Sequence, residues 1–156
     1  MEKSLDRIEL GRRGFVAAGA ALITTTALFG ASASAALPEV KAAIAAILGD
    51  RTAEEGRISL DLPEIAENGN TVPLTIEVES PMSADDYVKS VHIFAEGNPL
   101  PEVATVNFTP RSGEAIASTR IRLAKTQKIH AVAEMSDGSV FTATREVKVT
   151  IGGCGG

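Results

Sequence analysis

The chain has 156 residues, a formal net charge of −5 and one cysteine, and 44% of its residues are hydrophobic. This length favours one modest domain, and the acidic balance argues against nucleic-acid binding, which needs a basic face. One cysteine cannot form an internal disulfide. His92 and His130 lie far apart in the sequence, so they do not suggest a metal centre. We therefore expect no metal, no cofactor and no nucleic-acid partner. The lone Cys154 is the residue to explain.

Residues 1–35 have the pattern of a bacterial export signal. A polar stretch leads to Arg12 and Arg13, an uncharged run rich in Ala, Gly and Thr follows, and two overlapping Ala-Ser-Ala sequences end at Ala35. The paired arginines indicate the twin-arginine route, and the small residues indicate a cleavage site. The run is too short for a membrane span, which needs about 20 apolar residues. We expect cleavage to leave a periplasmic protein without a membrane span.

Residues 36–151 are expected to form one domain that begins with a short helix over 37–48. Its apolar residues recur at helical spacing, Pro38 suits the first turn and Gly49 suits the residue after the last turn. The pattern does not indicate whether this helix packs on the domain or on a partner.

From Arg57 onward, apolar and polar residues alternate, as in half-buried strands. Strands are expected over 58–62, 72–78, near 91–93, 103–109, 115–123, 129–135 and 140–151, with a hairpin turn at Asp137-Gly138. About seven strands without intervening helices predict an all-β fold, an immunoglobulin-like antiparallel β-sandwich with one short N-terminal helix. No serine or threonine stands in a nucleophile-elbow context, so we predict no catalytic residue.

The last five residues are Gly152, Gly153, Cys154, Gly155 and Gly156. Glycine runs at a terminus favour a flexible arm, which we expect over 152–156. No cation in the tail activates the thiol, which suits an attachment site better than a catalytic one. Two hypotheses remain: a carrier arm that holds a covalent adduct, or an assembly or adhesion module cross-linked to a partner through Cys154. A ubiquitin-like sulfur carrier also ends in Gly-Gly, but the export signal argues against it.

The chain resembles the SoxY family of thiosulfate-oxidation carrier proteins. The resemblance rests on the GGCGG terminus, the twin-arginine start and the segments 65–82 (IAENGNTVPLTIEVESPM), 86–101, 108–127 and 131–139. It implies a sandwich that carries sulfur and is not itself an enzyme. Cys154 would hold thiosulfate as a cysteine S-thiosulfonate, and the four glycines would keep the arm slim.

The resemblance also implies partners. These are a SoxZ-like sandwich protein that forms the SoxYZ complex, a haem-containing enzyme that couples thiosulfate, a manganese hydrolase that releases sulfate, and a sulfane dehydrogenase. A cluster of Arg120, Arg122, Lys125 and Lys128 is a further candidate, since it could guide anionic sulfur compounds, although strand charges usually face solvent.

Overall fold

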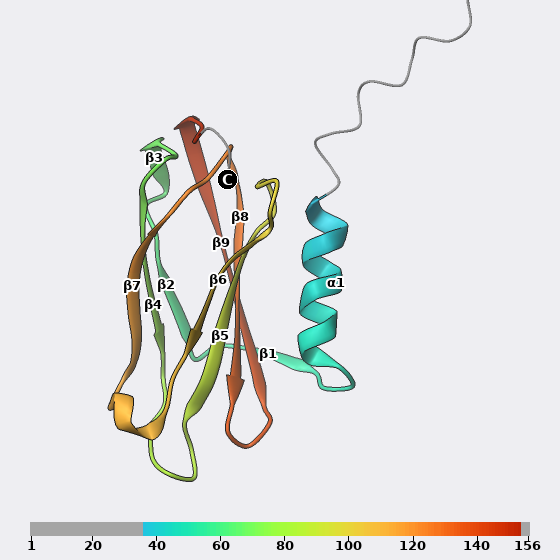
Figure 1. The fold of residues 1–156 in the computed structure, drawn as a ribbon, viewed down its shortest axis with the longest axis vertical. Coiled ribbons are helices and arrows are strands. Elements are labelled where there is room, and N and C mark those ends of the chain that lie inside the picture. The colour runs from blue at the N-terminus through green and yellow to red at the C-terminus, as the bar shows by residue number, and fades with distance from the viewer. Residues whose placement is uncertain (1–35, 154–156) are drawn as a thin grey trace, which may run out of the picture. The chain divides into compact units, whose positions relative to one another are not determined.

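The computed structural model describes residues 36–153, which form one helix followed by strands (Figure 1). The elements in chain order are α1 (Ala36–Leu48), β1 (Ala53–Glu55), β2 (Ile58–Asp61), β3 (Ile65–Asn68), β4 (Val72–Val78), β5 (Val88–Ala95), β6 (Glu102–Asn107), the 3₁₀ turn η1 (Pro110–Ser112), β7 (Ala115–Ile121), β8 (Gln127–Met135) and β9 (Val140–Ile151). The predicted export signal over 1–35, with Arg12 and Arg13, lies outside the described residues, and so do Cys154, Gly155 and Gly156.

The strands form two layers (Figure 1). The larger sheet has the order β1-β9-β8-β5-β6, with β3 also paired to β9, and the smaller sheet has the order β2-β4-β7. The prediction of an all-β sandwich with a short N-terminal helix is therefore confirmed.

The core lies between the two sheets and follows the alternation in the sequence. In β4, residues Val72, Leu74, Ile76 and Val78 are buried and the residues between them are exposed or half-buried. They belong to one apolar cluster with inward-facing residues of β5 and β8, among them Ile93. Because side chains alternate across a strand, one face of β4 is available for the core and the other for solvent.

Helix α1 covers part of the outer face of the larger sheet, so Phe94 of β5 and Val132 of β8 are buried on that face as well. Val40 of α1, which is 1% exposed, packs with Phe94, Val132 and Val140 in a second apolar cluster. The helix ends as expected: Gly49 has a φ of +57° and its N–H donates to the Ala45 carbonyl at 2.9 Å. The helix therefore packs on the domain itself. No helix within residues 36–153 is long and apolar enough to cross a membrane.

The pairing departs from the antiparallel pattern of the sandwich at one edge. β1 and β3 both pair with β9 in parallel, β1 along its beginning and β3 along its end. These two strands are three and four residues long and mostly exposed, so they carry no alternating pattern that the sequence could reveal. Their pairing matters for function because β3 leads directly into the segment that contacts the C-terminal glycines.

Candidate functional site: the root of the cysteine arm

The C-terminal segment leaves the sandwich at the end of β9, where three backbone segments meet. Gly69 donates its N–H to the Ile151 carbonyl at 2.8 Å and accepts a hydrogen bond from the Leu123 N–H at 2.8 Å. The Leu123 carbonyl in turn accepts from the Gly153 N–H at 2.9 Å. We call this chain of hydrogen bonds through Gly69, Leu123, Ile151 and Gly153 the arm root.

The structure describes the first two glycines of the predicted arm, Gly152 and Gly153. Gly153 is buried and hydrogen-bonded to the sandwich, and Gly152 is half-buried. The sandwich therefore holds the Gly153 backbone through one hydrogen bond, and the flexible arm over 152–156 stays a prediction. The expectation for Cys154, Gly155 and Gly156 stays a prediction, since they lie outside the described residues.

Close backbone approach explains why these positions are glycine. A Cβ atom on Gly152 would lie 2.1 Å from the Ala124 carbonyl oxygen, and one on Gly153 would lie 2.9 Å from the Gly69 carbonyl oxygen. Real Cβ atoms essentially never approach that closely. Local packing by itself therefore favours glycine at both positions.

Gly69 belongs to the same site, although the sequence indicates only its place in a turn. Its Cβ would lie 2.2 Å from the Leu123 carbonyl oxygen and 2.8 Å from the Gly153 nitrogen. The Asn68-Gly69 pair does signal a turn, and Asn68 accepts the Asn70 N–H through its side-chain oxygen at 2.9 Å. The Asn-Gly pair predicts the turn, but it does not predict that Leu123 and Gly153 pack against Gly69.

The segment 122–126 contains Leu123 and packs against the C-terminal glycines. It joins β7 of the smaller sheet to β8 of the larger one, so it crosses from layer to layer (Figure 1). The side chains of Asn98 and Gln127, 5% and 6% exposed, fill the space beneath it. Neither residue was predicted from the sequence, because neither stands in a recognisable motif.

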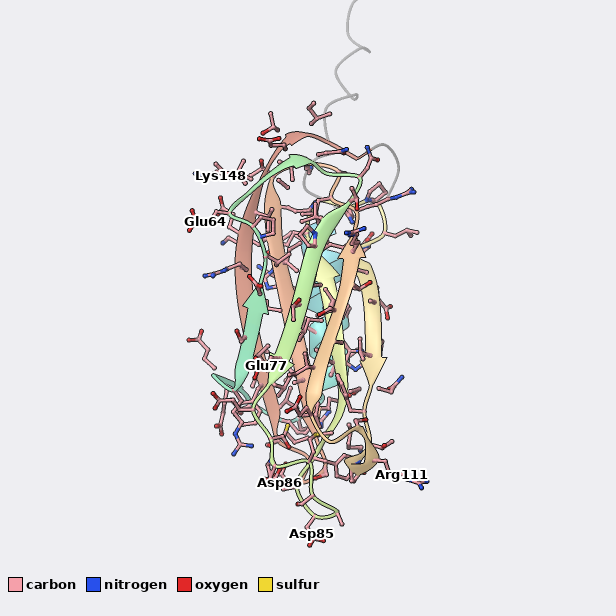
Figure 2. The ribbon with its side chains drawn as sticks, turned by 90° about the vertical axis from the view of Figure 1, so that its left-hand side faces the viewer. Glu64, Glu77, Asp85, Asp86, Arg111 and Lys148 are labelled. Carbon is pink, nitrogen blue, oxygen red and sulfur yellow. The ribbon has the colours of Figure 1, made fainter. Side chains whose placement is uncertain are left out.

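The arm root occupies one end of the sandwich. Figure 2 shows Glu64 and Lys148 at one end of the molecule, and Asp85, Asp86 and Arg111 at the opposite end. Glu64 directly precedes β3, and its carbonyl accepts the Lys148 N–H at 2.9 Å. The acidic turn at 85–86 is therefore remote from the point where the arm begins.

The predicted basic cluster is brought together only in part. Arg120 and Arg122 line a surface cavity of about 280 Å³ together with Asn98, Leu100 and Glu102. Lys125 and Lys128 are exposed and do not line it. Because Glu102 lines the cavity beside the two arginines, the cavity is not a purely basic site for anions.

The two histidines lie on the outer face of the larger sheet, away from the core, and each contacts a different glutamate. His92 Nε2 lies 3.4 Å from Glu134 Oε1, and His130 Nε2 lies 2.6 Å from Glu96 Oε1. Within residues 36–153, no group of three potential ligands is placed to hold a metal ion.

Glu134 has the clearest electrostatic perturbation on this face. Partial burial raises its pKa, but the Arg51 guanidinium at 2.8 Å and the His92 ring outweigh that effect, so the pKa of Glu134 lies below its usual value of 4.5. Arg51 also donates to the Leu48 carbonyl at the end of α1 at 3.1 Å. The ion pair therefore ties α1 to the sheet and is structural.

The fold and the arm root define a class: a two-sheet sandwich whose last strand leads into a glycine-flanked terminal cysteine. The profile of the family described as "Sulfur oxidation protein SoxY" matches residues 44–154. The solved structure of the sulfur carrier protein SoxY from Chlorobium limicola f thiosulfatophilum is 36% identical, with a TM-score of 0.61. The match covers 74% of this chain and 99% of that one. The chain belongs to the SoxY family, as the sequence predicted.

Other solved structures share the fold alone. A superoxide reductase (neelaredoxin) from Ignicoccus hospitalis, the T24K variant, is 20% identical with a TM-score of 0.55, and the match covers 62% of this chain and 82% of that one. The superoxide reductase from Nanoarchaeum equitans is 16% identical with a TM-score of 0.52, and the match covers 62% of this chain and 96% of that one. No curated protein sequence matches the chain. The solved SoxY relative is a carrier protein, which agrees with the prediction of a carrier that is not itself an enzyme.

Proposed function

We propose that this protein is a periplasmic sulfur carrier that holds thiosulfate-derived sulfur covalently on Cys154 and presents it to sulfur-oxidising enzymes. Membership of the SoxY family carries the proposal. The arm root supports it, because the last residues before Cys154 leave the sandwich from a hydrogen-bonded position at one end. In this proposal the partner enzymes supply the catalysis, and this chain carries the sulfur between them.

The loading step is an oxidation. The Cys154 thiol and thiosulfate join through a new S–S bond to give the S-thiosulfonate, with loss of one proton and two electrons. A haem-containing partner takes up both electrons. The covalent bond keeps the reactive sulfur attached between one enzyme and the next.

The release step is a hydrolysis. Water attacks the terminal sulfonate sulfur, the S–S bond to that sulfur breaks, and hydrogen sulfate leaves while a persulfide stays on Cys154. A manganese hydrolase performs this step, and a sulfane dehydrogenase oxidises the remaining sulfur. A SoxZ-like sandwich protein completes the carrier as its partner.

The intact mass of the protein recovered from the periplasm tests the proposal. After exposure to thiosulfate with the partner enzymes, the mature chain should begin at Ala36 and carry adducts that reductant removes. Cys154→Ser should carry none, since it lacks the thiol that forms the S–S bond.

Three results would overturn the proposal or its attachment site. One is an unmodified mass for the wild-type chain after exposure. Another is a reductant-labile cross-link from Cys154 to another protein without any sulfur adduct, which would favour the assembly module. Sulfur loading of Cys154→Ser would move the attachment site elsewhere.

A further inference from the structure

Buried polar side chains are rare in this domain, and two of them meet at the arm root. Among residues 36–153, only Ser90, Asn98 and Gln127 are polar and buried. Burying an amide is costly unless its hydrogen bonds are satisfied, so a buried amide pair needs a structural reason. Every buried side-chain nitrogen and oxygen in the described part of the chain has a partner.

The hydrogen bonds of Asn98 bracket Leu123. The Asn98 Nδ2 group donates to the Arg122 carbonyl at 2.8 Å, and its Oδ1 atom accepts the Ala124 N–H at 3.0 Å. Between these two contacts, both backbone groups of Leu123 face the arm root, one bonded to Gly69 and the other to Gly153. Asn98 therefore fixes the backbone on both sides of Leu123, the residue that is hydrogen-bonded to Gly153.

Gln127 fixes the orientation of Asn98. Its Nε2 group donates to Asn98 Oδ1 at 3.0 Å and to the Lys125 carbonyl at 3.0 Å. Its Oε1 atom accepts the Gly97 N–H at 2.6 Å. All these partners are satisfied at once only when both amides keep one orientation, so the network specifies a single conformation of the segment 122–126.

Neither sheet could hold this segment by itself. β7 ends at Ile121 and β8 begins at Gln127, so the residues between them lie outside both ladders. The amide pair supplies the hydrogen bonds that a ladder would otherwise give to the Arg122 carbonyl and the Ala124 N–H.

We propose that Asn98 and Gln127 are positioning residues of the carrier arm: through Leu123 they hold Gly153, so that the segment bearing Cys154 leaves the sandwich from one place. Their importance for delivery rests on the proposed carrier function. A thiol that must enter a partner's site gains from a fixed starting point, because less freedom is lost on engagement.

The test compares Asn98→Leu and Gln127→Met with a matched control, Ser90→Ala. Ser90 is the third buried polar residue, but its hydroxyl contacts His92 and Glu134 on the outer face of the larger sheet. Gln127→Met keeps the length of the side chain and provides a second variant if Asn98→Leu does not fold. Folding is checked by circular dichroism and thermal unfolding of the full mature chain.

The first readout is hydrogen exchange of the Gly153 amide, followed by NMR. Its exchange should accelerate by roughly tenfold in both variants, as for the loss of one buried hydrogen bond, and should stay unchanged in Ser90→Ala. Unchanged exchange in the two variants, or equal acceleration in the control, would overturn the positioning role.

The second readout is the KM and kcat of a partner enzyme with the loaded carrier as substrate. We expect KM to rise severalfold in the two variants while kcat holds and the control stays at wild-type values. Faster Gly153 exchange with unchanged KM would refute the role in delivery. A wild-type chain that accepts no sulfur would instead refute the carrier function, and the exchange experiment would still decide whether the amide pair holds the arm root.

Discussion

The substitution Gly69→Ala tests whether close backbone contact holds the arm root. The new methyl group would lie 2.2 Å from the Leu123 carbonyl oxygen and 2.8 Å from the Gly153 nitrogen. Ordinary contact requires these segments to separate by about 1 Å. Hydrogen bonds of 2.8 and 2.9 Å, from Leu123 to Gly69 and from Gly153 to Leu123, do not survive such a displacement.

The expected cost follows from these contacts. Overpacking contributes about 1–3 kcal/mol and two lost backbone hydrogen bonds about 0.5–1.5 kcal/mol each. Alanine also makes the unfolded chain less flexible, which offsets about 0.4–1 kcal/mol. We therefore expect Gly69→Ala to lower the free energy of unfolding by about 1–5.5 kcal/mol, with a central value of about 3 kcal/mol.

Urea unfolding measures this loss, and hydrogen exchange at Gly153 locates it. Gly49→Ala is the matched control, because Gly49 has a φ of +57° and a Cβ atom added there would meet no heavy atom within 4 Å. That control should cost about 1–2 kcal/mol from backbone strain alone and leave Gly153 exchange unchanged. A Gly69→Ala protein as stable as the wild type, with Gly153 still protected, would refute the reasoning.

Two further predictions concern the outer face of the larger sheet. Val40→Ala should lower the free energy of unfolding by about 1–3 kcal/mol, because Val40 is buried against Phe94 and Val132. Amide hydrogen exchange should accelerate in α1 while β4 stays protected. Equal acceleration in both elements would contradict independent docking of the helix. Glu134→Gln should cost up to about 1 kcal/mol at pH 7, since the ion pair with Arg51 is partly exposed. The pKa of Glu134 is lower in the folded chain than its usual 4.5, so its contribution is present above that value and lost as the pH falls through the folded pKa. Urea unfolding at pH 7 and at acid pH should show the difference between Glu134→Gln and wild type shrinking, and a constant difference would argue against the ion pair.

Local patterns in the sequence determine most of the fold. The apolar spacing over 37–48 predicts α1 (Ala36–Leu48) to within one residue, and Gly49 ends it as expected. Alternation predicts β4 (Val72–Val78) and β9 (Val140–Ile151), since residues two apart share one face of a strand. The glycine-flanked Cys154 likewise predicts an arm from composition alone, and this stays a prediction because Cys154 lies outside the described residues.

Tertiary structure alone decides how the arm is held. β1 (Ala53–Glu55) and β3 (Ile65–Asn68) exist as strands because β9 lies beside them, and their short, exposed sequences carry no period of their own. Gly69, Leu123 and Gly153 are far apart in the chain, and only folding brings their backbones into hydrogen-bonding distance. Asn98 and Gln127 acquire their role in the same way, since a buried amide is defined by the neighbours that satisfy it, and no local pattern encodes those neighbours.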